Sequence, residues 1–431
     1  MATVLGSGER PAPAFLSRMA QANQKVICTA KGEDVRTVNV EYLLQKRLRI
    51  PIFQRRYCWY KEQWNTLLGD VCLVANGSKE KHALGRITCV LDNSGDGRLL
   101  VVDGQQRNTT CSLLLAAVRD VAATRHSEEC LKLVSKLESL LFPGGLEEWM
   151  SARQPGTPLE EGAELGAAAL VPTYCDRASY FAATLPRRAS VPSVPDSGSW
   201  MRPMEAKLFF SDRLVGESDK HLVAVAEAVL YKLEWLLFPI SLGEGHKDGT
   251  EDLHLIFERL ALRDATFCKP HRATEYANMG AADFVRNLLL GSFAEEADAI
   301  HAYKTYWLPI EKSAAKVAEA KQESVASHLE AALEAFLKAN PRQRKKANLA
   351  AAGVGGALYA RFRRWLVDME VATDPKQTTD TMDLLHRLHD FALQHFEGGP
   401  VRQASPPGLD AWSFGSTTKQ PPALIPCRED C

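Results

Sequence analysis

The segment at residues 99–119, LLVVDGQQRNTTCSLLLAAVR, constrains the fold of this chain more than any other stretch. Its first four residues are apolar and predict a buried strand. The Asp-Gly pair that follows predicts a tight turn. Asn108 and the two threonines after it are residues that begin helices, and an apolar helical pattern follows them. The segment therefore predicts a strand, a tight polar turn and a helix, in that order.

The polar residues of this turn suit an anion. The start of a helix directs free backbone N–H groups and the positive end of the helix dipole outward, which favours phosphate. Arg107 can add a fork-shaped cation, and Asp103 could hold a metal ion or a ribose hydroxyl. The alternative is that Asp103 and Gly104 only make the turn and that the glutamines are solvated. The concentration of polar residues between a buried strand and a helix favours a binding site.

Two more blocks precede the turn. The first is IPIFQRRYCW at residues 50–59, where Pro51 favours an extended entry. Gln54, Arg55 and Arg56 could face the same ligand as Arg107, whereas the aromatic residues of the block suit the core. The second is HALGRI at residues 82–87, which begins a strand predicted over 82–91. That strand and the next form a hairpin that presents the DGQQR turn at its far end.

The three blocks resemble the IPxFQRxYxW, H-x-LG-x-I and DGQQR motifs of the N-terminal domain of GmrSD-type restriction-system proteins, over roughly residues 35–125. The resemblance implies an α+β, ParB/sulfiredoxin-like domain that handles a nucleoside triphosphate with Mg²⁺. On the matching positions it implies catalytic roles for Asp103, Gln105, Gln106 and Arg107. It implies nucleotide binding by Gln54, Arg55, Tyr57, Gly104, Asn108 and Thr109.

Later segments extend the resemblance. FERL at 257–260 and ADFVRNLL at 282–289 resemble the family's FExLN and aDLIRNxLL pair, although Ala261 stands where asparagine is expected. Asp283, Arg286 and Asn287 are spaced to share one helical face. They could support the site, or form a buried ion pair that joins two helices.

The charge pattern adds a candidate nucleic-acid surface. The chain has a formal net charge of −1, yet residues 335–367 contain no acidic residue. This window could follow the phosphates of DNA, or it could be a solvated loop. The histidines near residues 386–389 fit a solvent-facing helix, so no metal site is predicted. The candidate patch consists of Arg342, Arg344, Lys345, Lys346, Arg361 and Arg364.

The composition of the chain and its stretches rich in Gly, Pro and Ser suggest how it is organised. We expect a disordered lead at 1–33, the ParB/sulfiredoxin-like domain at 34–126, and a mostly α-helical domain at 127–397. Loop insertions are expected near 143–166 and 186–203, and a disordered tail at 398–431. No apolar run is long enough to span a bilayer, and the ten scattered cysteines suggest reduced thiols. We therefore expect an intracellular, cytoplasmic protein, although the first 30 residues faintly resemble an organelle transit peptide.

Two functions follow from the resemblance. One is Mg²⁺-dependent binding and hydrolysis of a nucleoside triphosphate. The other is a non-catalytic nucleotide switch or DNA-binding module. The last third of the chain contains no HNH nuclease motif of the kind that relatives often carry. DNA cleavage would thus need a separate nuclease subunit as partner, while the nucleotide and DNA remain candidate ligands of this chain.

Overall fold

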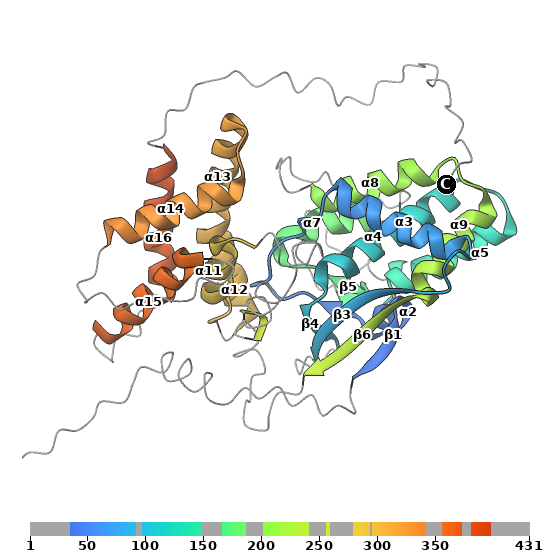
Figure 1. Ribbon diagram of the computed structural model, residues 1–431, viewed down its shortest axis with the longest axis horizontal. Coiled ribbons are helices and arrows are strands. Elements are labelled where there is room, and N and C mark those ends of the chain that lie inside the picture. Colours follow the sequence, from blue (N-terminus) through green and yellow to red (C-terminus); the bar gives the residue numbers. More distant parts are fainter. Residues whose placement is uncertain are drawn as a thin grey trace, which may run out of the picture.

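The computed structural model describes residues 35–91, 97–147, 166–186, 201–240, 256–258, 279–293, 295–340, 356–372 and 381–397. Within these ranges the chain forms a helix-covered sheet followed by a group of helices (Figure 1). This matches the expected α+β region followed by a mostly α-helical one. No helix in the described ranges is long and apolar enough to cross a membrane.

The sheet has six strands in the order β1-β6-β3-β4-β2-β5 and mixes parallel with antiparallel pairs. β3 and β4 are antiparallel neighbours at its centre, as the hairpin prediction required, and β3 also pairs with β6 in parallel. The short β2 is parallel to both β4 and β5. The strands are β1 (Arg36–Asn39), β2 (Leu48–Arg49), β3 (His82–Leu91), β4 (Leu99–Asp103), β5 (Leu170–Val171) and β6 (Leu233–Ile240).

Helices cover one face of this sheet (Figure 1). Val101 of β4 points to that face and belongs to the core that these helices share with the sheet. α4 lies at the centre of the layer, and its residues 113–118 are fully buried apolar side chains. The helices are α2 (Val40–Lys46), α3 (Lys61–Ala75), α4 (Gln105–Ala122), α5 (Glu128–Leu141), α7 (Tyr174–Thr184), α8 (Arg202–Leu214) and α9 (Asp219–Glu227).

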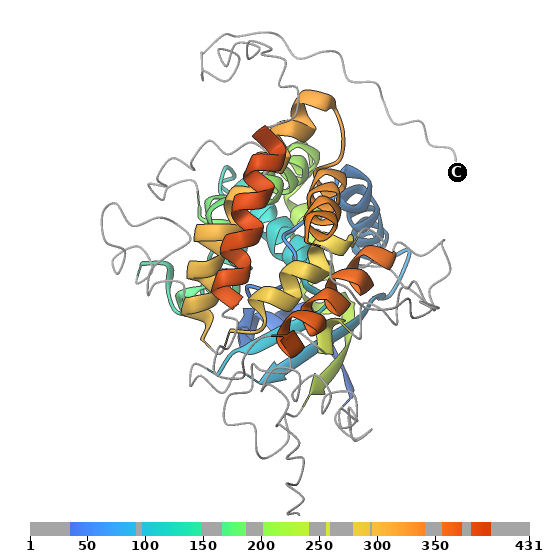
Figure 2. The ribbon, with the colours of Figure 1, turned by 90° about the vertical axis from the view of Figure 1, so that its left-hand side faces the viewer.

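A second group of helices lies beside the sheet and is seen in front of it in Figure 2. Leu100 and Val102 of β4, which alternate with Val101, belong to the core of this second group. Ile52 and Phe53 join the same core, so the two parts of the chain are packed together. The helices are α11 (Ala281–Leu290), α12 (Glu296–Ala302), the π-turn η4 (Tyr303–Trp307), α13 (Leu308–Lys321), α14 (Val325–Ala339), α15 (Gly356–Ala372) and α16 (Thr381–Glu397).

Three elements differ from what the local sequence pattern predicts. The helical spacing of apolar residues in 37–49 predicts one helix, but these residues form β1, the short helix α2 and β2. The pattern at 221–237 also predicts a helix, but the helix ends in the π-turn η3 (Ala228–Lys232), and β6 follows from Leu233. The Ala-, Glu- and Lys-rich segment 313–338 predicts one long helix, which the structure divides into α13 and α14 at Gln322, where φ is +57°.

The sheet also extends past residue 126, where the sequence placed the end of the α/β domain, because it includes β5 and β6. The lead at 1–33, the tail at 398–431 and most of both expected insertions lie outside the described residues.

Candidate functional site

The DGQQR turn joins the end of β4 to the start of α4. Gly104 precedes the helix with φ +99°, a backbone conformation that residues with a side chain rarely adopt. A Cβ at this position would lie 3.0 Å from Cγ1 of Ile87 and 3.3 Å from its Cα. Glycine is therefore required for both conformation and space, and it lets α4 begin immediately above β3.

Arg107 is bound to β3 by a second glycine-dependent contact. Its Nη1 donates to the carbonyl of Leu84, and its Nη2 donates to the carbonyl of Arg86 at 3.3 Å. The guanidinium also lies 4.9 Å from the centre of the Trp235 ring. Gly85, with φ +92° at a bulge of β3, has no Cβ to collide with Nη1. These contacts of Arg107 therefore hold the start of α4 on the sheet.

Gln106 holds a loop on the other side of α4. This segment, residues 50–58, is called the FQRR loop below. The Gln106 Oε1 accepts from the backbone N–H of Cys58 at 2.9 Å, and its Nε2 donates to the carbonyl of Arg56 at 3.1 Å. Gln54, which is fully buried, donates from Nε2 to the carbonyl of Val102 at 2.9 Å. The loop is thus fixed to the DGQQR turn on both sides of Arg55.

Tyr57 anchors the same loop inside the core. Its hydroxyl accepts from Nε1 of Trp64 at 2.8 Å and lies 2.7 Å from Oγ1 of Thr110. Burial raises the pKa of this hydroxyl, against the hydrogen bonds from both partners. Tyr57 was predicted to bind nucleotide, and that role stays a prediction. In the structure its hydroxyl is used to seat the loop on α3 and α4.

Arg55 differs from the other residues of the site. Its side chain is only 6% exposed, and the described part of the chain gives its guanidinium neither a hydrogen bond nor an ion pair. None of its nitrogens is among the buried side-chain atoms that lack a hydrogen-bond partner, so the guanidinium keeps a small contact with solvent. The loop fixes Arg55 between Gln54 and Arg56, which are tied to β4 and α4. The site therefore contains a largely buried arginine whose charge, unpaired in the described structure, suits an anionic ligand.

Asp103 ends β4 with a buried carboxylate. Its Oδ2 lies 3.3 Å from Nη2 of Arg86, a residue of β3. Thr88, which pairs with Asp103 across the strands, has a buried hydroxyl with no hydrogen-bond partner in the described structure. Asp103 is thus held by a cation and lies beside a hydroxyl with unused hydrogen-bonding capacity.

The remaining predicted residues of the turn are also buried. Gln105 begins α4 and is 5% exposed, and Thr109 lies one turn further into the helix. Asn108 is 1% exposed, and neither its Oδ1 nor its Nδ2 has a hydrogen-bond partner within the described residues. A buried amide with both ends unused is rare in folded proteins, and it is a second unsatisfied polar group near the start of α4.

Candidate metal ligands are sparse at this turn. Within the described residues there is no group of three or more His, Cys, Asp or Glu side chains that could hold an ion. Mg²⁺ is commonly held by one or two carboxylates together with phosphate oxygens and water. Asp103 is the carboxylate that this mode could use, so the residues present are compatible with Mg²⁺ carried on a phosphate chain.

The predicted supporting residues on α11 separate into different roles. Asp283 accepts from the backbone N–H of Gly280 at 3.1 Å and caps its own helix. Arg286 reaches the FQRR loop, where its Nη2 donates to the carbonyl of Ile52 at 3.0 Å. Asn287 is fully buried. The other interpretation, a buried ion pair that joins two helices, stays a prediction, and the contact observed for Arg286 is to a loop carbonyl.

The candidate DNA surface lies mostly outside the described residues. Arg342, Arg344, Lys345 and Lys346 fall in the undescribed range 341–355. Arg361 forms an exposed ion pair with Glu334 at 3.3 Å, and Arg364 is exposed on α15. The patch therefore stays a prediction.

Sequence reasoning did not identify four residues that shape the site. Thr173 and Asp176 hold the FQRR loop, and Arg86 and Thr88 flank Asp103. The available signal was segment 170–177, LVPTYCDR, which contains Asp176 and Arg177 and resembles a segment of the same family that leads into a helix. Nothing in the sequence indicated which loop Asp176 would contact.

The comparison with known families agrees with this geometry. Residues 40–169 match the family model described as GmrSD restriction endonuclease, N-terminal domain. This part of the chain is therefore a GmrSD-type N-terminal domain, and it contains both the FQRR loop and the DGQQR turn. No curated protein matches the chain.

Proposed function

We propose that the site between the FQRR loop and the DGQQR turn binds a nucleoside triphosphate. The observation that carries the proposal is Arg55, a largely buried arginine whose guanidinium has no counter-charge in the described structure. A phosphate chain would supply that charge and accept fork-shaped hydrogen bonds from the guanidinium. The match to a restriction-system domain is consistent with a nucleotide-handling module.

The start of α4 would supply the second half of the phosphate site. The first N–H groups of a helix have no partner within the helix, and the positive end of its dipole favours an anion. Gly104 allows close approach there because it has no side chain. Asn108, with its unused amide, would contact the nucleotide through hydrogen bonds.

Hydrolysis is the finer part of this proposal. A water molecule would attack the terminal phosphorus, the phosphoanhydride bond would break, and inorganic phosphate would leave. Such transfer depends mainly on positioning and on neutralising charge, which bound Mg²⁺ supplies when present. Asp103 would orient the water or a water on the ion, and Arg55 would stabilise charge on the phosphate oxygens.

A nucleotide switch without turnover is the second candidate, and the contacts of Gln106 favour it. Both ends of that amide hold the FQRR loop, so they would have to be released before they could orient a water. Asp103 is paired with Arg86. Binding would then order the loop, and a separate nuclease subunit would respond to it. DNA would be a ligand of the partner or of the predicted basic patch.

The test combines binding with phosphate release. ATP, GTP, CTP and UTP with Mg²⁺ are each added to the full chain, and thermal stabilisation and released phosphate are recorded. The hydrolase predicts stabilisation by at least one nucleotide, together with turnover that Asp103→Asn abolishes. The switch predicts stabilisation without turnover.

The matched control is Asp212→Asn, which removes an exposed carboxylate on α8. This variant should show the same thermal stabilisation and the same phosphate release as the wild type. If no triphosphate stabilises the wild-type chain, the proposed site is wrong in both versions.

A further inference from the structure

The FQRR loop is held from two sides, and the second side belongs to the helical part of the chain. Thr173, just before α7, directs its hydroxyl at the carbonyls of Ile52 and Gln54, at 3.4 Å each. The backbone N–H of Tyr57 donates to Oδ2 of Asp176 at 2.6 Å. Arg286 of α11 then donates to the same Ile52 carbonyl. The conformation that presents Arg55 thus depends on groups far from the DGQQR turn.

Arg286 is the contact that comes from the greatest distance along the chain. It is 2% exposed and lies 5.3 Å from the centre of the Tyr303 ring. Its Nη2 also lies 3.5 Å from Oγ1 of Thr173, so one guanidinium touches both the loop and the segment that holds it. A charged donor on a backbone carbonyl forms a stronger bond than a neutral one.

Buried charges hold the Arg286 guanidinium in place. Glu311 of α13 is 5% exposed and accepts from Tyr303 and Trp307 at 2.9 and 3.0 Å. Burial lowers the pKa of Arg286, but nearby acidic groups that include Glu311 more than offset this, so the pKa is raised. Arg286 therefore stays charged and is confined by α13 as well as by its own helix.

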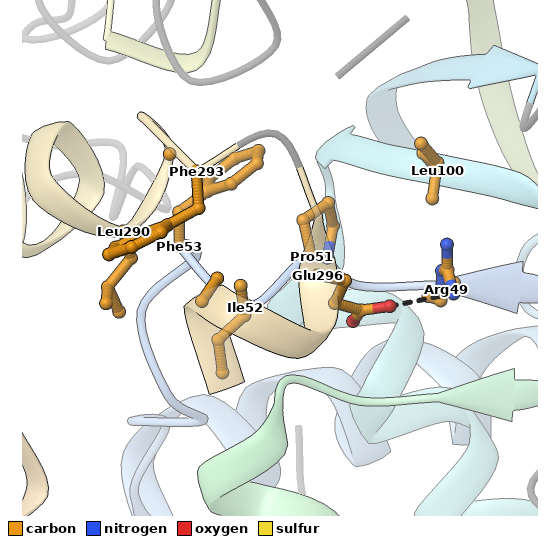
Figure 3. Close-up of a pocket in the computed structure, with 10 residues that line it drawn as sticks. Arg49, Pro51, Ile52, Phe53, Leu100, Leu290, Phe293 and Glu296 are labelled. Carbon is orange, nitrogen blue, oxygen red and sulfur yellow. Dashed lines mark ion pairs between the residues drawn. The ribbon is translucent and has the colours of Figure 1, made fainter. Parts of the chain in front are cut away.

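The apolar side of the loop is less tightly held. A cavity of about 50 Å³ lies beside Pro51, Ile52 and Phe53 and is closed on its far side by α11 and α12. Figure 3 shows Ile52 and Phe53 beside Leu290 and Phe293, with the Arg49–Glu296 ion pair at one edge. Incomplete packing gives the loop room to shift, so its position depends more on the polar contacts.

We propose that Arg286 is a positioning residue that sets the nucleotide affinity of the site from the helical part of the chain. This inference rests on the proposed function, because Arg286 would act through the FQRR loop and Arg55 without touching the nucleotide. Without Arg286 the loop samples other conformations, and the apparent dissociation constant rises in inverse proportion to the binding-competent fraction that remains.

The test compares Arg286→Lys with the wild type and with the control Arg363→Gln. Arg286→Lys keeps the charge but has a shorter side chain that lacks the guanidinium nitrogen Nη2, which contacts both Ile52 and Thr173. Arg363→Gln removes a charged contact of similar kind, to Glu258 at 2.9 Å, that does not touch the loop. The probes are ATP, GTP, CTP and UTP with Mg²⁺, using whichever binds the wild type.

The expected result is a roughly ten-fold rise in the dissociation constant for Arg286→Lys and no change for Arg363→Gln. Amide hydrogen exchange should rise in residues 52–58 of Arg286→Lys while exchange in α4 stays at the wild-type level. Wild-type affinity and loop exchange in Arg286→Lys would overturn the inference and leave the nucleotide site standing.

Two further outcomes complete the test. If the wild type binds none of the triphosphates, the proposed function fails and this inference fails with it. If Arg286→Lys does not fold, hydrogen exchange on the wild type decides: triphosphate binding should protect amides of α11 around Arg286 as well as the loop. Protection confined to the FQRR loop and α4 would overturn the inference that Arg286 of α11 positions the loop for nucleotide binding.

Discussion

The DGQQR turn and the FQRR loop each carry an arginine beside the start of α4, and the two arginines are held in opposite ways. Arg107 of the turn is bound to two carbonyls of β3 and lies over Trp235. Arg55 of the loop is buried with no such partner in the described structure. The difference teaches that the arginine of the turn holds α4 on the sheet, while the arginine of the loop is the cation that the proposed ligand would neutralise.

The same division applies to the other polar residues. Gln106 is used twice on the loop backbone, and Asp103 is paired with Arg86. Within the turn, the amide of Asn108 has no hydrogen-bond partner at either end in the described structure. Most polar side chains of the motif are therefore used for structure, and the proposed ligand contacts come from fewer positions.

The largest effect should come from the turn itself. Gly104→Ala places a Cβ against Ile87 at a positive φ that alanine rarely adopts, so the free energy of unfolding should fall by about 2–4 kcal/mol. Urea unfolding measures this change in the free energy of unfolding. Gly69→Ala, within α3 and with no atom near its Cβ, should instead raise stability by about 0.5–1 kcal/mol. Equal effects at both positions would refute the packing argument.

Removing the contacts between Arg107 and β3 should have the next largest effect on stability. Arg107→Met leaves the carbonyls of Leu84 and Arg86 without their charged donor, and the free energy of unfolding should fall by about 2–3 kcal/mol. Arg213→Met removes an exposed arginine that lies over Phe209 on α8 and should change stability by less than about 0.5 kcal/mol. A wild-type unfolding midpoint for Arg107→Met would show that the contacts of Arg107 with β3 do not contribute to stability.

The smallest effect concerns pH. Burial raises the pKa of Asp176 from 3.8 to about 7, against the Tyr57 N–H and the charges of Arg56 and Arg286, which lower it. The folded state thus binds this proton more tightly than the unfolded state, so this carboxyl reduces stability as pH rises from about 4 to 7.

Asp176→Asn keeps a hydrogen-bond acceptor for Tyr57 without the titration. Urea midpoints at pH 5 and pH 8 should therefore differ less for the variant than for the wild type. An unchanged difference would mean that Asp176 is already ionised throughout this range in the folded protein.

The sequence was most informative where pattern and turn chemistry agree. The strand, turn and helix at 99–119 and the hairpin partner at 82–91 are confirmed, because both strands are apolar and the Asp-Gly turn is distinctive. A short strand is expected at 238–242, and it overlaps the end of β6. The first part of β6 was missed because Leu236, although 42% exposed, fills the apolar run between Trp235 and Leu237 and hides the two-residue period. β1 and β2 are too short for a periodic signal.

The roles of the site residues could not be read from spacing. The carbonyls that bind Arg107 are brought to it by a bulge at Gly85, and no local pattern predicts that long-range contact. Likewise, Arg286 meets Ile52 across 234 positions of the chain. Motif composition predicted a cluster of polar residues at this turn, and only the fold separates those that hold the structure together from those that the proposed ligand could use.

The most direct test of this account measures triphosphate affinity and stability for Arg55→Met and Arg107→Met side by side. The account predicts that Arg55→Met loses affinity by roughly 100-fold, as expected for a lost charge-assisted phosphate contact. Without nucleotide, its stability should equal or exceed that of the wild type, because the Arg55 guanidinium makes no hydrogen bond or ion pair in the described structure that the substitution would remove. Wild-type affinity in Arg55→Met, with binding lost in folded Arg107→Met, would contradict the division between the two arginines.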